Sequence, residues 1–250
     1  MKPIIMSTDD VRGILDGRKT MARRVVKPQP TYWDDGERVY DKGNIAGPEF
    51  YAPVRVDKNG EQYPGKEVYG IYSDDGEYGC KAPCQPGDVL WVRETWRVGA
   101  WDDEGSICVD YKSDGFVRRE WLKISDYDLY EGLWQQSSDD AREANATIDE
   151  YGSYTWLPGQ APTRWRSPFT MPPEVARLFL RVTDVRVERV QDITVDDAGR
   201  EGFEGFHHKN PMLGNLPEIV WNFKNEWDAH NANGWESNLF VWVISFERLE

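Results

Sequence analysis

Two stretches in the last third of the chain alternate in hydropathy, which is the pattern of a β-strand with one buried face. The alternation is clear in residues 239–249 and imperfect in residues 178–190. Side chains that alternate in this way point to opposite faces of a sheet. The imperfect alternation predicts a bend in the longer strand, as small barrels often require. Residues 3–6 and 89–94 are short runs rich in β-forming side chains and predict two further strands.

Capping signals and helical spacing predict three helices between these strands. Ser7 is a typical N-cap for residues 8–16, whose apolar positions lie on one helical face, and Gly17 is well placed to end that helix. Thr194 is a second capping residue and predicts a helix that runs to position 200 or 201. Residues 217–229 carry apolar side chains at helical spacing.

The order of these elements indicates an α+β protein. Most of the predicted strands lack a helical crossover, which favours a mixed or antiparallel sheet with helices at its side. We expect a single domain, 1–250, that is interrupted by two long insertions rich in turn residues. The predicted core segments are 1–27, 86–97 and 164–250, and the predicted insertions are 28–85 and 98–163. We expect loops and one hairpin in the first insertion and a short helix at 139–145 in the second.

The charge of the chain narrows the classes of ligand. The formal net charge is −14, and such a protein does not coat nucleic acid through a uniformly positive surface. The segment after the first helix, which we interpret as a loop, is nevertheless basic, and it contains Arg18, Lys19, Arg23 and Arg24. These four side chains are candidates for contacts with phosphates or base edges. The alternative is a solvated loop that pairs with the many carboxylates of the chain.

Several common classes of site have no signal in the sequence. No run of 18 apolar residues predicts a membrane span, and the first residues do not resemble a signal peptide, so we expect a cytoplasmic protein. Phosphate-binding loops, serine-hydrolase elbows and zinc-protease helices are missing from the sequence, and we predict no cofactor. The scattered spacing does not predict a metal site at Cys80, Cys84, Cys108, His207 and His208.

Four short motifs, in order along the chain, resemble the ASCH family. They cover residues 14–20, 86–92, 182–185 and 242–246. Residues 164–194 are also similar to phage and prophage proteins that carry this domain. The resemblance implies a PUA-like small β-barrel with flanking helices and with a cleft that binds RNA or a modified nucleoside. It also implies the cytoplasm of a bacterial host cell.

The resemblance also implies site residues. One branch of the family resembles amidohydrolases that remove the acetyl group from N4-acetylcytidine, and another relative is a ribonuclease. In the amidohydrolase branch a Lys and a Thr of the basic segment and a Glu of a later helix form the site. The Lys falls on Lys19 and the Glu on Glu201, but the Thr position holds Ala22. Thr20 is an imperfect substitute, because on a strand it lies about 7 Å from position 22.

Charged residues in the strand 89–94 are further candidates. Arg93 and Glu94 need partners inside a strongly β-forming segment, so we expect them to line the cleft, whereas Trp91 fits a core position.

Three functions therefore remain open at this point. The first is a module that binds RNA or a modified nucleoside, and the second is a hydrolase of acylated nucleosides or of RNA. The third is a phage accessory protein whose acidic, aromatic insertions contact another protein. The absence of a hydroxyl at Ala22 favours the first over the second.

Overall fold

The computed structural model describes residues 1–250 except 31, 35–36, 40–44, 74–77, 115–119 and 250. The described residues form an α+β structure with four α-helices. They divide into two compact units, each of which is described here by itself. Unit 1 comprises Met1–Asp16 and Leu90–Phe179, and unit 2 comprises Gly17–Val89 and Leu180–Leu249. The prediction of a single domain with two insertions remains a prediction.

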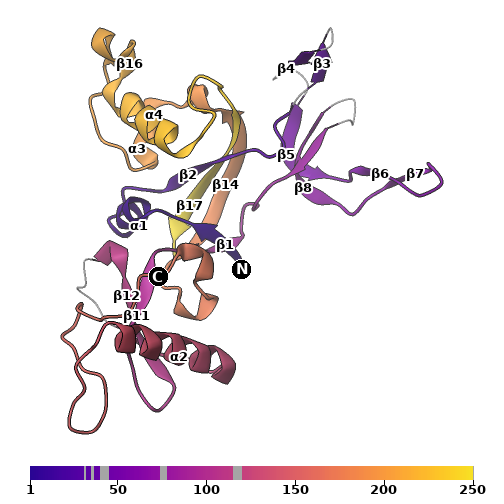
Figure 1. The fold of residues 1–250 in the computed structure, drawn as a ribbon. Helices are drawn as coiled ribbons and strands as arrows, with labels where there is room; N and C mark the ends of the chain where they lie inside the picture. The colour runs from indigo at the N-terminus through magenta and orange to yellow at the C-terminus, as the bar shows by residue number, and fades with distance from the viewer. Residues whose placement is uncertain (31, 35–36, 40–44, 74–77, 115–119, 250) are drawn as a thin grey trace. The chain divides into compact units, whose positions relative to one another are not determined.

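The centre of unit 2 is an antiparallel arrangement of three strands (Figure 1). Strand β17 (Phe240–Arg248) lies between β14 (Phe179–Arg189) and β2 (Met21–Val25). The two long strands match the alternating segments of the sequence. The register of β14 shifts between Val182 and Asp184, which is where the alternation in the sequence is imperfect.

Two helices of unit 2 supply the other side of its core. They are α3 (Val195–Arg200) and α4 (Glu218–His230), as the capping and spacing signals predicted. The Thr194 side chain accepts a hydrogen bond from the Asp197 N–H and so begins α3. Apolar side chains of β2, β17 and both helices form one buried cluster, which includes Met21, Ala198, Ile219, Val220, Phe223, Trp227, Val241 and Val243.

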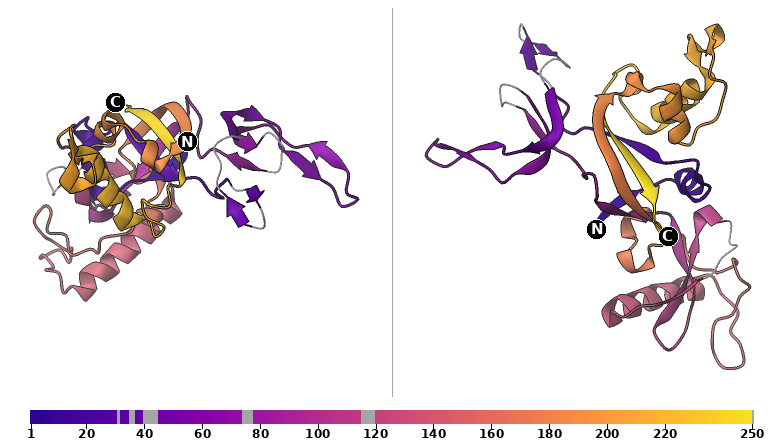
Figure 2. Two further views of the ribbon diagram at one scale, coloured as in Figure 1. Left: turned by 90° about the horizontal axis from the view of Figure 1, so that it is seen from above. Right: turned by 180° about the vertical axis from the view of Figure 1, so that it is seen from behind.

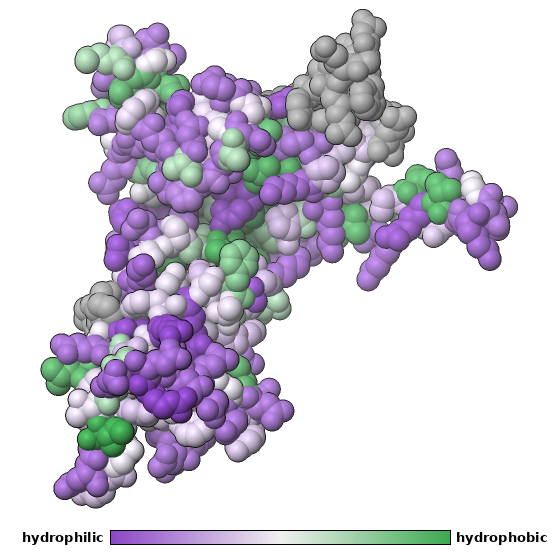
Figure 3. All heavy atoms as spheres, viewed as in Figure 1, coloured by the Kyte–Doolittle hydropathy of each residue, from purple (hydrophilic) through white to green (hydrophobic). Residues whose placement is uncertain are grey.

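The predicted insertion 28–85 contains more strand than the sequence indicated, since we expected loops and one hairpin. Its strands are β3 (Tyr32–Asp34), β4 (Glu37–Val39), β5 (Ile45–Tyr51), β6 (Val54–Val56), β7 (Gln62–Pro64), β8 (Val68–Ser73) and β9 (Gly79–Lys81). They pair locally as β3–β4, β6–β7 and β5–β8–β9. Hairpin β6–β7 leaves Val54 and Val56 exposed, and Figure 3 shows apolar atoms on its surface. A last short pair joins β15 (Lys209–Asn210) and β16 (Leu216–Pro217).

Unit 1 combines a parallel strand pair with a helix-covered sheet. Strand β1 (Lys2–Ile5) pairs with β10 (Val89–Arg93). Between them in sequence, α1 (Thr8–Leu15) begins at Ser7, which forms the predicted capping box with Asp10. The sheet is antiparallel and consists of β11 (Trp96–Trp101), β12 (Ser106–Tyr111) and β13 (Glu120–Lys123).

Helix α2 (Tyr127–Glu143) lies against this sheet (Figure 2), and Leu133 packs into a core with Trp96, Val98, Ile107 and Val109. The sequence predicted only a short helix at 139–145. The 3₁₀ helices among the described residues span Lys112–Asp114, Pro168–Thr170, Pro173–Val175, Val190–Asp192 and Pro211–Leu213.

The sheets in the described part of the chain are open, so the predicted closed barrel is not observed. A barrel requires every strand to have two hydrogen-bonded neighbours. Strand β2 ends its sheet and pairs only with β17 among the described residues. The basic segment thus supplies an edge strand, where the sequence predicted a loop.

Candidate functional site

Strand β2 directs alternate side chains toward helix α3. Met21 belongs to the core shared with α3 and α4, while Lys19 and Arg23 both contact Glu201 at the end of α3. Alternation therefore places residues 19, 21 and 23 on the face toward the helices. Ala22 lies on the other face, fully buried and opposite Ile244 of β17.

Lys19 and Glu201 form a buried ion pair. The Lys19 Nζ lies 2.8 Å from Glu201 Oε2 and also donates to the Glu201 carbonyl oxygen at 2.8 Å. Each side chain is only 5% exposed. Gly202 follows with φ +94°, a conformation that suits glycine and turns the chain directly after Glu201. The expectation that the two residues lie close together is confirmed by this distance, whereas a catalytic role for them remains a prediction.

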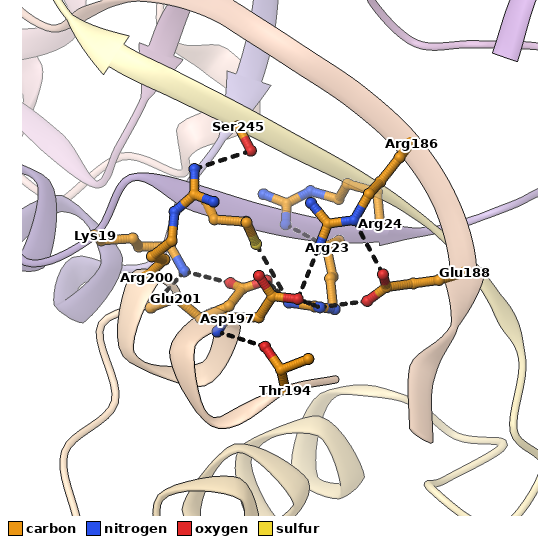
Figure 4. A network of polar contacts seen from close by, with 11 residues as sticks. Lys19, Arg23, Arg24, Arg186, Glu188, Thr194, Asp197, Arg200, Glu201 and Ser245 are labelled. Carbon is orange, nitrogen blue, oxygen red and sulfur yellow. Dashed lines mark hydrogen bonds and ion pairs between the residues drawn. The ribbon is translucent and has the colours of Figure 1, made fainter. Parts of the chain in front are cut away.

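Arg23 is the centre of a larger cluster (Figure 4). Its guanidinium pairs with Glu201 Oε1 at 3.1 Å, with Asp197 Oδ2 at 3.2 Å and with Glu188. The Arg23 side chain is 1% exposed, and its guanidinium lies 5.6 Å from the ring centroid of Phe223. Burial on this scale is tolerable only because each charge has an opposite partner.

Arg186 completes the cluster on its more exposed side. Its Nε lies 3.1 Å from Glu188, and its guanidinium also pairs with Asp197 at 2.6 Å. Burial lowers the pKa of Arg186, but the neighbouring Glu188 and Asp197 carboxylates outweigh it, so that the pKa is raised overall. We call Lys19, Arg23, Arg186, Glu188, Asp197 and Glu201 the buried ion cluster.

The basic segment is therefore divided between the interior and the surface of unit 2. Lys19 and Arg23 are buried against carboxylates, which leaves little of either for a phosphate. Arg18 is 44% exposed and donates to the Gly202 carbonyl, and Arg24 donates to the Arg23 carbonyl from a half-buried position. Arg200, which the sequence did not single out, is exposed and donates to Ser245 Oγ.

Thr20 contributes its backbone to this region. Its N–H donates to the Arg200 carbonyl at 2.8 Å, and its carbonyl accepts from Phe246 N–H at 2.9 Å. Alternation places its side chain on the same face as Ala22 and away from Lys19. The local geometry thus does not bring the Thr20 hydroxyl to the Lys19–Glu201 pair.

Arg93 and Glu94 belong to unit 1, where Glu94 has its own buried partners. Arg177 pairs with Glu94 through Nε at 2.9 Å, and Ser113 Oγ donates to the same carboxylate at 2.5 Å. The Arg93 guanidinium lies 4.7 Å from the Trp91 ring centroid. Glu94 is 2% exposed, so its carboxylate faces the interior of unit 1.

Three further features bear on the site: possible metal ligands, the cysteines and the hydropathy of the helices. Within the described ranges, no three His, Cys, Asp or Glu side chains lie close enough together to hold a metal ion. The three cysteines are buried thiols, and burial raises the pKa of Cys80. None of the helices that the structure describes is long and apolar enough to cross a membrane.

Comparisons of the chain with protein-family models, with curated proteins and with solved structures give no match. The resemblance to the ASCH family therefore remains a prediction that rests on the sequence motifs.

Proposed function

We propose that unit 2 binds a nucleoside, or a modified base of an RNA, beside the buried ion cluster. The observation that carries this proposal is the contact between Lys19 and Glu201, which are 182 positions apart in the sequence. Neither periodicity nor charge pattern pairs these two residues. The ASCH resemblance pairs them because it assigns both to one site, and the 2.8 Å distance is what that arrangement requires.

The chemistry of the site suits a base edge. A glutamate carboxylate is a good acceptor for the exocyclic amine of cytosine or adenine. Here Lys19 binds Oε2 and Arg23 binds Oε1, which orients the buried Glu201 carboxylate, and each oxygen keeps a second lone pair that can accept from a base. Arg18 and Arg200 are exposed nearby in sequence and space and can reach a ribose or phosphate.

Binding is better supported than turnover. An acyl-transfer mechanism through a threonine needs a hydroxyl beside a base. Ala22 has none, and alternation along the segment directs the Thr20 side chain away from Lys19. We extend the proposal to the fold: β2, β14 and β17 with α3 and α4 correspond to part of a PUA-like core.

Calorimetric titration of the full chain with cytidine, N4-acetylcytidine, adenosine and uridine tests the proposal. We expect one or more of the amine-bearing or acetylated nucleosides to bind and uridine to bind weakly. Glu201→Gln should lower the affinity by about 10- to 100-fold, the usual contribution of a well-placed base contact. Glu204→Gln is the matched control, because the Glu204 side chain is 81% exposed and close in sequence. Circular dichroism verifies that both variants are folded.

The proposal is overturned if no nucleoside binds, or if Glu201→Gln binds as tightly as the unchanged protein.

The mixtures of protein and N4-acetylcytidine from this titration also test a second candidate function, a hydrolase, which the Lys19–Glu201 contact also favours. Glu201 would take a proton from a water that attacks the acetyl carbonyl and would pass this proton to N4 as the N4–acyl bond breaks, so that cytidine and acetate are released. If the protein releases acetate and the Glu201→Gln variant does not, the hydrolase is supported. If the protein binds the nucleoside without releasing acetate, the binding module is supported.

A further inference from the structure

Unit 1 contains a hollow of about 540 Å³ that neither the ion cluster nor the proposed function uses. It lies where the end of β11, helix α2 and the loop 152–156 meet, segments that Figure 1 shows close together. This volume is in the usual range of small-ligand sites. The wall is more polar than apolar and combines aromatic side chains with hydroxyl groups and carboxylates. The residues that matter below are Trp101, Asp102, Asp103, Trp134, Tyr154 and Trp156.

The aromatic wall is held in position. The ring centroids of Trp101 and Trp156 are 5.4 Å apart, with their planes inclined at 59°. Trp156 Nε1 donates to the Gly99 carbonyl at 2.7 Å, which fixes that ring against β11. Trp101, Trp134, Tyr154 and Trp156 are half-buried, so each leaves part of its surface for a ligand. Aromatic faces carry a negative quadrupole and attract cations.

The charge of the hollow is negative. Asp102 Oδ1 accepts hydrogen bonds from the N–H groups of Glu104 and Ser106. The Ser106 backbone bond above all, with the Glu104 backbone bond and Lys123 nearby, lowers the pKa of Asp102 from its ordinary acidic value. Asp103 is exposed at the rim. None of the described residues that line the hollow is Lys, Arg or His, so phosphates and other anions are disfavoured there.

We propose that this hollow binds an organic ammonium cation of the quaternary type, with aromatic faces around the methyl groups and with carboxylates at the rim. Such a cation is weakly hydrated, so it loses little when it enters a partly aromatic site, and the two aspartates add long-range attraction. The inference is independent of the proposed function, because the hollow belongs to unit 1 and selects the opposite charge from a nucleic acid. The same chemistry occurs in free choline and in a trimethylated lysine side chain.

Titration of the full chain, labelled with ¹⁵N at tryptophan, tests the inference through its indole N–H resonances. We expect choline to shift a small subset of the resonances, and 3,3-dimethyl-1-butanol, its uncharged isostere, to bind at least about fivefold more weakly. A short peptide whose only charged side chain is a trimethyllysine distinguishes the two sources. Tighter binding of the peptide than of choline indicates a side chain of a protein partner, and tighter binding of choline indicates the free cation. Either result supports the cation site.

Matched variants locate the effect. Trp156→Ala should weaken choline binding by about fivefold or more, whereas Trp121→Ala should not, because Trp121 is 56% exposed on β13 and outside the hollow. Asp103→Asn should weaken binding two- to fivefold, and Glu174→Gln, another exposed acid of unit 1, is its control. Asp103→Asn leaves the aromatic wall intact, so it tests the proposal even if Trp156→Ala is unfolded.

Three outcomes would contradict the proposed cation site. The first is that choline leaves every indole resonance unmoved. The second is that the neutral isostere or a methyl glucoside binds as well as choline, which would make the hollow a site for neutral ligands. The third is that adenosine monophosphate binds better than choline, which would contradict the negative charge assigned to it.

Discussion

At the scale of single residues, Arg23 is the group on which the buried ion cluster depends. It contacts Glu188, Asp197 and Glu201, and its side chain is almost completely inaccessible to water. Burying such charges costs several kcal/mol per ion, which the mutual attraction offsets only when every charge is paired. Removal of Arg23 would leave three carboxylates with only Lys19 and Arg186 to balance them.

Replacement of Arg23 by Met therefore has a large expected effect. Methionine keeps an unbranched apolar stem but has no guanidinium, so the carboxylates lose their central partner, and breaking a buried pair costs about 3–5 kcal/mol of unfolding free energy. Urea unfolding followed by circular dichroism measures this change. Arg18→Met is the control and should cost less than about 1 kcal/mol, since Arg18 is exposed and lies 3.9 Å from Glu204. Equal losses in the two variants would contradict the central role of Arg23.

The sequence could predict part of this cluster but not its arrangement. Lys19 and Glu201 were paired through a family resemblance, and the basic segment was visible as a run of charge. Asp197 and Glu188 were missed, although a charged residue in the interior of a long strand is a signal that it needs a partner. The burial of Arg23 could not be foreseen while residues 21–25 were interpreted as a loop, because only the alternation of a strand turns that side chain inward.

At the scale of elements, helix caps and strand alternation predicted the bounds of their elements well, whereas the extent of a largely polar helix was underestimated. The helices begun by Ser7 and Thr194 and the strands β14 and β17 appear close to their predicted bounds. Helix α2 was underestimated because its buried residues are only Leu133, Ser137 and Ala141, which leaves little apolar periodicity. The hairpins of residues 45–81 were missed because Gly47 and Pro48 interrupt β5, whose register shifts between Ala46 and Glu49, and because β6, β7 and β9 have only three residues each.

The cap of α3 matters for the site as well as for the helix. The Thr194 hydroxyl accepts from Asp197 N–H at 3.0 Å, and the Asp197 carboxylate pairs with Arg23 and Arg186. Thr194→Ala should lower the unfolding free energy by about 1 kcal/mol. Thr194→Ser should keep most of this stabilisation, because serine retains the hydroxyl. Thr183→Ala, at an exposed position of β14, should change it by less than about 0.5 kcal/mol. If Thr194→Ser were as unstable as Thr194→Ala, the methyl group rather than the hydroxyl would be responsible.

At the scale of the whole molecule, the excess negative charge lies outside the buried ion cluster. The chain has 44 acidic and 30 basic side chains of the Asp, Glu, Lys and Arg types. The cluster contains three cations and three carboxylates, so it is neutral and contributes nothing to the difference of 14. A ligand that approaches from solution therefore meets a field that repels phosphates, even where Arg18 and Arg200 offer local contacts.

This field predicts an unusual dependence of binding on salt. A protein that neutralises phosphates binds nucleic acid more tightly as salt falls, since counterions are released. Here the screening length increases from about 8 Å at 0.15 M salt to about 30 Å at 0.01 M, so lower salt extends the repulsion. We expect the affinity for an oligonucleotide that includes the bound nucleoside to fall or stay level when the salt concentration is lowered from about 0.15 M to about 0.01 M. The affinity for the free nucleoside should stay constant. Fluorescence anisotropy of a labelled oligonucleotide, with calorimetry of the nucleoside as control, measures both. A rise in oligonucleotide affinity of tenfold or more at low salt would mean that a basic surface gathers phosphates in spite of the net charge, and the ligand would then be the RNA backbone and not the base.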